Sequence, residues 1–397
     1  MNEIEVIKFE SINDFRSAPI IKKIFVKKER AMNSFSRYAK YSIVLVSVFL
    51  VMSYSAALGG DTLTVTSWGG AYSKSQIEAY QKPYAAKTGI TINAEDYNGG
   101  LAEIRSQVQT GNVSWDVVDV EKNDLLAGCD DGLFEILDVN AFPPAPDGTP
   151  ASKDFLPGAL HECGAGTIVW STAIAFDKSK FPGEKPSKLA DFFDVKKFPG
   201  VRSLKKTPKI NLEFALMADG VPREKVYEVL STEEGVQRAF AKLDTIKDSL
   251  IWWDAGAQPP QMLADGEAVM VSAYNGRIFN AQVAEKKPFE IIWDGQICEM
   301  DFYVIPKGTK NLKLAIDFVK FATDTQRGAD QASWISYGPT RKSSVPLIST
   351  YHGTDIQMGP HMPTAPDNFK TALLKDPEWW ADNQDEMIKR FNAWMAK

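Results

Sequence analysis

The chain has 397 residues, with 45 basic and 51 acidic side chains and a net charge of −6. An acidic chain is a poor binder of nucleic acid or of anionic membrane surfaces, because both carry negative charge. The length is sufficient for two domains of ordinary size.

The N-terminal region predicts export from the cytoplasm. Arg37 and Lys40 precede an apolar run over 43–52, and small residues at 53–57 offer a cleavage point after Ala57. The apolar run is too short, and too soon followed by polar sequence, for a membrane span. We therefore expect a signal peptide over 32–57 that begins at Met32, and a periplasmic mature protein. Residues 1–31 are expected to reflect a start site placed too early, or an N-terminal extension.

The first part of the mature chain alternates short strands with helices. Strands are predicted over 62–66, 90–94 and 115–120, with helices after each of them. Three such units favour a mostly parallel sheet with crossover helices. Trp68 and Tyr72 flank a Gly-Gly turn at the carboxyl end of the first strand, which is where ligands bind in open α/β sheets. The alternative is that Trp68 only caps the core.

A different pattern follows a Pro-rich surface segment at 142–157. The nearly continuous apolar run over 167–176 is long for one strand and suits a segment that passes between two sheets. Further strands are predicted over 268–272, 290–293 and 298–306, and the main helices over 211–218, 223–230, 232–246, 311–323 and 377–396. Trp379, Trp380 and Trp394 stand at helical spacing in the last helix, which indicates core packing.

The chain contains three cysteines. In an oxidising compartment Cys129 and Cys163 can pair, because they flank the end of the first α/β stretch. Cys298 lies in a predicted strand and is expected to be a small buried apolar residue.

Six motifs, in this order along the chain, resemble the spermidine/putrescine-binding family of extracytoplasmic solute-binding proteins of ABC transporters. They are SWGGAY at 67–72, WDVV at 115–118, LEFAL at 212–216, SAYNG at 272–276, DFYVIP at 301–306 and YGPT at 337–340. The resemblance implies an α/β, two-lobed periplasmic binding protein fold of type II. Each lobe would be a mixed sheet flanked by helices, with the ligand cleft between the lobes. Lobe one would comprise 61–168 and 302–338, lobe two 172–299 and 344–397, and the crossings would lie near 169–171, 300–301 and 339–343.

The resemblance also implies a set of ligand-binding residues. Aromatic faces hold amines by cation–π contact, and carboxylates hold the ammonium ends. Asp301 matches the central carboxylate of the family. The alternative is a structural role, in which a buried Asp301 pairs with Arg277 or Arg341 instead of with a ligand. Trp253 is expected to line the cleft, because adjacent residues of a strand face opposite ways and Trp252 would then face the core. The complete expected set is Trp68, Tyr72, Glu121, Trp253, Asp254, Tyr274, Glu299, Asp301 and Tyr337.

One departure from the family concerns the second end of the ligand. The acidic pair that clasps one amine aligns with the basic and neutral stretch 205–210 (KKTPKI). This favours a shorter or singly anchored amine, such as putrescine, over a long polyamine held at both ends. More acidic than basic groups are expected to point into the cleft.

An enzyme needs a constellation of reactive groups that this sequence lacks. There is no Gly-x-Gly-x-x-Gly after a strand, no phosphate-binding loop and no His-Glu-x-x-His, and the three histidines are scattered. We therefore expect the substrate-binding component of an ABC importer, a monomer without cofactor or metal, which delivers a small organic cation to a permease in the inner membrane. The alternatives are the same transport role for a sugar or another small polar metabolite, and an exported enzyme.

Overall fold

The computed structural model describes residues 61–397. The predicted signal peptide and the residues before it lie outside this range. Among the helices of residues 61–397, none is both long and apolar enough to cross a bilayer.

The first part of the chain forms the predicted β–α units. β1 (Thr62–Ser67) is rich in β-branched residues and almost wholly buried, as expected for a central strand. It leads through Gly69 into a long helical segment made of α3 (Gly70–Gln76), a π-helical turn (Ile77–Gln81) and α4 (Lys82–Thr88). The units that follow are β2 (Thr91–Asp96) with α5 (Ala102–Thr110), and β3 (Val117–Glu121) with α6 (Lys122–Asp130).

The rest of the chain builds the second half of the sheet and its helices. Its strands are β4 (Leu160–His161), β5 (Gly164–Asp177), β6 (Arg202–Lys205), β7 (Leu250–Trp253), β8 (Met270–Tyr274), β9 (Phe289–Val304), β10 (Gly338–Pro339) and β11 (Leu373–Leu374). Its main helices are α8 (Leu189–Phe193), α9 (Asn211–Ala218), α10 (Val226–Leu230), α11 (Glu233–Asp244), α12 (Gln258–Asp265), α13 (Asn275–Val283), α14 (Leu312–Ala322), α15 (Thr325–Ala332) and α16 (Pro377–Met395).

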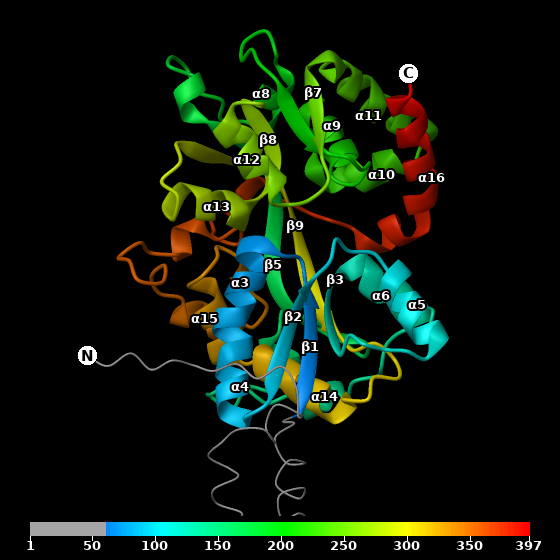
Figure 1. The fold of residues 1–397 in the computed structure, drawn as a ribbon. Coiled ribbons are helices and arrows are strands. Elements are labelled where there is room, and N and C mark those ends of the chain that lie inside the picture. The colour runs from blue at the N-terminus through cyan, green and yellow to red at the C-terminus, as the bar shows by residue number, and fades with distance from the viewer. Residues whose placement is uncertain (1–60) are drawn as a thin grey trace, which may run out of the picture. The chain divides into compact units, whose positions relative to one another are not determined.

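The strands join in one mixed sheet with the order β2-β1-β3-β9-β5-β8-β6-β7. β1 pairs in parallel with β2 and β3, and β6 in parallel with β7 and β8, whereas β9 is antiparallel to β3 and β5, and β5 is antiparallel to β8. The short strand β11 pairs in parallel with β9. β5 and β9 lie side by side along the middle of the fold, with α4 and α14 towards one end and α9, α11 and α16 towards the other (Figure 1). The two long strands thus connect the two halves of the structure.

Each half has its own apolar core, and the fold is the two-lobed α/β class that the sequence predicts. One large cluster gathers residues of β1, β3, α4, α14 and the start of β5, and includes Tyr80, Tyr84, Phe155, Tyr303 and Phe318. Another gathers residues of α8–α11, α16 and the other end of β5, and includes Phe192, Phe214, Leu243, Trp380 and Phe391. The lobe boundaries and crossings given above stay a prediction.

The aromatic residues of α16 pack as expected. Trp380 and Trp394 are buried in this second core, and Trp379 packs against it. Trp252 contacts Trp394 edge-on with ring centroids 6.1 Å apart, while Trp253 faces the other side of β7.

The structure differs from the sequence prediction in the length of the second connecting strand. The segments 290–293 and 298–306 were predicted as two separate strands. They form one strand, β9, whose register on β5 shifts between the pairs Thr172–Ile297 and Ile174–Ile292. The extra residues of β9 are accommodated as an irregularity, where Gly295 adopts a left-handed conformation with φ of 69°.

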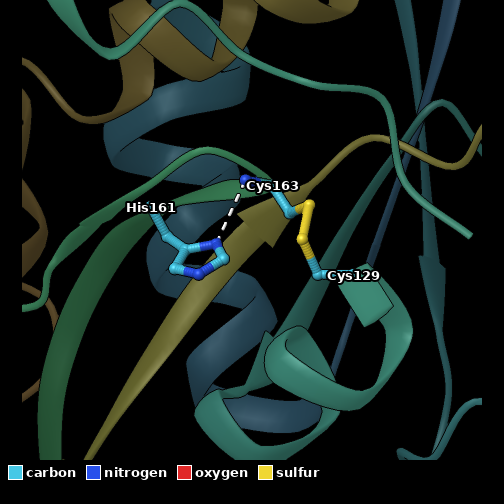
Figure 2. A group of neighbouring side chains, drawn as sticks. All are labelled: Cys129, His161 and Cys163. Atoms are coloured by element: carbon cyan, nitrogen blue, oxygen red, sulfur yellow. Dashed lines mark hydrogen bonds between the residues drawn. A yellow bond between two sulfur atoms is a disulfide. The ribbon is translucent and has the colours of Figure 1, made fainter. Parts of the chain in front are cut away.

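The predicted disulfide joins Cys129 of α6 to Cys163, which lies just before β5 (Figure 2). The backbone N–H of Cys163 also donates a hydrogen bond to Nδ1 of His161, over 3.2 Å. The bridge ties the third β–α unit to the first connecting strand. Cys298 is buried with its thiol free, as predicted.

Candidate functional site

Two adjoining cavities lie where the ends of β1, β3, β6 and β8 approach the middle of β5 and β9. The larger one, the main cavity, has a volume of about 380 Å³. The smaller one, the inner recess, has a volume of about 20 Å³. They share four wall residues, which are Trp68, Glu121, Trp170 and Tyr274.

Eight of the nine predicted site residues line these cavities. The main cavity is lined by Trp68, Glu121, Trp253, Tyr274 and Glu299, and the inner recess by Trp68, Tyr72, Glu121, Tyr274, Asp301 and Tyr337. Asp254 lies outside both, because the chain turns away after β7 and its backbone N–H donates to Gln258 Oε1 over 2.7 Å. Its side chain is exposed.

Aromatic rings form the walls between the two cavities. Tyr274 stands edge-on to Trp170 and to Trp253, with centroid distances of 4.8 Å and 5.4 Å. Tyr72 and Tyr337 meet edge-on at 5.3 Å. The sequence did not identify Trp170 as a site residue, because it lies in the middle of the apolar run 167–176, where the pattern predicts that a tryptophan belongs to the hydrophobic core. An apolar ligand chain between these rings would be shielded from water on several sides.

Asp301 and Asp119 form a buried acidic pair at the inner recess. Both side chains are almost inaccessible to solvent, and their carboxyl groups hydrogen-bond to each other. Trp170 Nε1 donates to Asp301 over 2.6 Å, and Tyr72 Oη donates to Asp119 over 2.7 Å. Within residues 61–397 neither carboxylate has a basic side chain at salt-bridge distance. The pKa of Asp301 is raised, first by burial and then by the charge of Asp119.

The two arginines expected as alternative partners of Asp301 are engaged elsewhere. Arg341 pairs with Asp154 over 3.0 Å, and both side chains are buried. Arg277 Nη2 donates to the backbone carbonyl of Trp68 over 3.0 Å, and its Nε has no hydrogen-bond partner although it is buried. Arg277 approaches Gly70 so closely that a Cβ at this left-handed position would overlap the guanidinium. Arg277 therefore lines the inner recess without pairing with Asp301.

The main cavity also contains three lysines. Lys375 Nζ contacts the carboxylates of Glu299 and Glu121, the latter over 3.2 Å. Although burial acts to raise it, Lys375 and Lys209 lower the pKa of Glu121 to about 2. Lys375 is thus neutralised within the protein. It lies directly after β11, far along the chain, and no motif marked it as part of the site.

Lys205 is the lysine without a carboxylate partner. Its Nζ donates to Tyr274 Oη over 2.9 Å and lies over the rings of Trp253 and Tyr274, at 5.7 Å and 5.6 Å from their centroids. No carboxylate of residues 61–397 lies within salt-bridge distance of it. Although burial acts to lower it, Tyr274 and Glu121 raise the pKa of Lys205 above its usual range, so this side chain stays charged.

The loop from Lys205 to α9 is held in place by the first residue of that helix. Asn211 Nδ2 donates to the carbonyls of Lys205 and Thr207, over 2.8 Å and 2.6 Å. Ile210, just before it, has a φ of 72°, which is strained for a β-branched residue. The loop therefore presents Lys205 and Lys209 to the main cavity in a fixed arrangement.

The charge of the cavity walls corrects one expectation from the sequence. The main cavity is lined by three acidic side chains, Glu121, Asp124 and Glu299, and by three basic ones, Lys205, Lys209 and Lys375. An excess of inward acidic groups was predicted, because the expected ligand-binding set contained four acidic residues and no lysine. Both signs of charge are present, and Lys205 is the basic group that has no carboxylate of residues 61–397 within salt-bridge distance.

One group of potential metal ligands occurs in residues 61–397, and it consists of Cys129, His161 and Cys163. The two sulfur atoms are bonded to each other, so neither is available as a thiolate ligand (Figure 2). The other two histidines pack against aromatic rings: His352 stacks on Trp334 and His361 contacts Phe279. These groups lie outside the residues that line the two cavities.

Comparisons with known proteins agree on the class of protein. A family model described as bacterial extracellular solute-binding protein matches residues 79–364. A γ-aminobutyric acid-binding protein from Pseudomonas aeruginosa is 44% identical over 364 residues, which is 92% of this chain and 99% of the relative. The crystal structure of PBP MotA from A. tumefaciens B6 in complex with glucopine is 30% identical, covers 84% of this chain and 100% of its own, and superposes with a TM-score of 0.76. A structure described as a GABA receptor is 31% identical, covers 85% of this chain and 98% of its own, and has a TM-score of 0.71.

Proposed function

The chain belongs to the bacterial extracellular solute-binding protein family, and we propose that its ligand is a short ω-amino acid such as γ-aminobutyric acid (GABA). Proteins of this class bind a small molecule and deliver it to an ABC permease. The proposal concerns the ligand, which carries an ammonium group at one end and a carboxylate at the other.

The observation that carries the proposal is that each of the two joined cavities holds an ionisable group without a partner of opposite charge in the protein. Asp301 offers a buried carboxyl in the inner recess without a basic partner, and Lys205 offers an ammonium in the main cavity without an acidic one. A buried charge is costly unless it is paired, so each group favours a ligand of opposite charge. Tyr274 borders both cavities, so it lies between the two charges.

The walls suit a zwitterion with a short aliphatic chain. The ammonium would enter the inner recess towards Asp301, where aromatic faces add cation–π attraction. The methylene chain would lie along Trp170 and Tyr274. The carboxylate would accept a charge-assisted hydrogen bond from Lys205 in the main cavity.

A diamine fits the same walls less well. Its second ammonium would approach Lys205 and Lys209, and like charges at short range are repulsive. The putrescine or spermidine ligand expected from the sequence stays a prediction, and it is the alternative that the experiment below must exclude. The similarity to a GABA-binding protein over nearly the whole chain favours the ω-amino acid.

Calorimetric titration of the purified protein tests the proposal. GABA, putrescine, spermidine, glucopine and glucose are compared under the same conditions, and we expect the tightest binding for GABA. Asp301→Asn should weaken GABA binding about ten- to a hundredfold, because a charge-assisted hydrogen bond contributes roughly 1.5–3 kcal/mol. Asp254→Asn is the matched control, since Asp254 is exposed and lies outside both cavities. Tight binding of putrescine with GABA silent would refute the proposal.

A further inference from the structure

Asp119 does not line either cavity, yet its negative charge raises the pKa of Asp301 more than the charge of any other residue does. The two residues lie on adjacent antiparallel strands, where Asp119 pairs with Tyr303 and Glu121 pairs with Asp301. Asp119 is therefore a diagonal neighbour of Asp301 on the same face of the sheet. Both are buried, and the Asp301 carboxyl hydrogen-bonds to Asp119.

The hydrogen-bond donors around the pair are unequally divided. Asp119 accepts from Tyr72 Oη over 2.7 Å, from Gln76 Nε2, and from Trp68 Nε1 over 3.4 Å. Asp301 accepts from Trp170 Nε1 alone among side-chain donors of residues 61–397. Donors stabilise the ionised form of a carboxyl group, so Asp119 is the ionised member of the pair. Two buried carboxylates in contact cannot both carry a charge without a cation, so Asp301 holds a proton and donates it to Asp119.

The other ionisable groups around the pair do not supply the missing positive charge. Burial raises the pKa values of the surrounding phenols, so they are neutral in the usual working range; these are Tyr72 of α3, Tyr80 of the π-helical turn, Tyr97 after β2, Tyr303 of β9 and Tyr337 before β10. Glu121 of β3 and Glu299 of β9 add negative charge and face Lys375. Arg277 of α13 is the cation in the recess wall, and it is directed to Trp68 and Tyr337.

We propose that Asp119 and Asp301 share one proton in the ligand-free protein, and that the ammonium group of the ligand takes its place, so that each capture releases one proton to solvent. The inference rests on the proposed function in one respect, which is that the ligand carries a primary ammonium. The charge of the pair balances: one negative charge with a proton becomes two negative charges facing one ammonium. The inner recess, at about 20 Å³, has room for one group of the size of water or ammonium.

The sign of the pH dependence follows from the released proton. Below the pKa of the pair, each unit of falling pH should weaken binding about tenfold, because the proton competes with the ammonium. Above this pKa the affinity should be independent of pH. Burial, followed by the negative charge of Asp119, raises the pKa of Asp301, the carboxyl that holds the proton, well above its usual range, so the dependence should be measurable at pH 5–7.

The experiment counts protons directly. GABA is titrated calorimetrically at pH 6 in buffers of different ionisation enthalpy, and the slope of the observed enthalpy against the buffer enthalpy gives the number of protons released. We expect about one proton for the wild type and for the control Asp254→Asn. Asp119→Asn should release less than half a proton and show a flat pH profile of affinity, because its amide can donate to an ionised Asp301. A purely structural role of Asp119 would weaken binding without changing the number of protons.

Two outcomes separate this inference from the proposed function. If putrescine binds and GABA does not, the ligand proposal fails, but proton release with putrescine still tests the shared proton. If GABA binds without releasing a proton in the wild type, the inference is overturned and the ligand proposal stands. Should no amine bind, the exchange of proton for ammonium is refuted, and carboxyl carbon NMR of the empty protein still shows whether the pair holds a proton at pH 6.

Discussion

Replacing Lys205 by methionine separates an amino acid ligand from a diamine. Lys205 is the cation of the main cavity that has no carboxylate partner, so its removal should act on the ligand rather than on a protein ion pair. Methionine keeps an unbranched apolar stem against Trp253 and Tyr274, which limits the effect on folding. The change therefore removes mainly the charge.

The expected effect has opposite signs for the two ligands. A charge-assisted hydrogen bond contributes roughly 1.5–3 kcal/mol, and 1.4 kcal/mol corresponds to about tenfold in affinity. Lys205→Met should therefore weaken GABA binding about ten- to a hundredfold. It should tighten putrescine binding, because a like charge has been removed from the wall.

Calorimetric titration of both ligands provides the measurement, and thermal unfolding shows whether the variant is folded. Lys206→Met is the matched control, since Lys206 is the next residue in the chain, is exposed and does not line the cavity. The control should bind GABA like the wild type. Unchanged GABA affinity in a folded Lys205→Met variant would show that the carboxylate is held elsewhere and would refute this placement of the ligand.

Three further predictions concern other parts of the structure. Arg341→Met leaves Asp154 buried without its cation, and it should lower the free energy of unfolding by about 3–5 kcal/mol in urea titration; a loss below 1 kcal/mol would contradict this. The double change Cys129→Ser and Cys163→Ser should cost roughly 3–4 kcal/mol in the same assay, because the bridge spans 34 residues; equal stability with and without it would count against the prediction. The trimethylated form of GABA should not compete with GABA, since its quaternary group exceeds the inner recess of about 20 Å³. Effective competition would place the ammonium outside the recess.

Local patterns were sufficient to predict the elements and several of the contacts. The β-branched run of β1, the alternation of strands and helices over the first three units, and the apolar faces of α14 and α16 match the structure because they depend on neighbours in the sequence. The disulfide was predicted from the oxidising compartment and from two cysteines that flank the end of the first α/β stretch. The strand β9 was divided in two by the prediction, whereas in the structure it continues through an irregularity opposite β5, where Gly295 has a positive φ.

The site was predicted only in part, for a reason that lies in distance along the chain. Motifs identified the residues whose type alone suggests a role, such as Trp68, Tyr274 and Asp301. They did not identify Trp170, which looks like core in its own strand, or Asp119, whose importance comes from its diagonal position beside Asp301.

What the sequence by itself determined is therefore the set of elements, their order and the chemical types available for a site. Which charges remain unpaired was decided by the tertiary structure, since an ion pair depends on residues brought together from far apart. Lys375 reaches Glu121 across 254 positions of the chain and is neutralised, whereas Lys205 finds only the hydroxyl and ring faces of aromatic residues. A buried charge without a partner favours a ligand of opposite charge. The arrangement of paired and unpaired charges in the tertiary structure therefore decides which kind of molecule the cavities can bind.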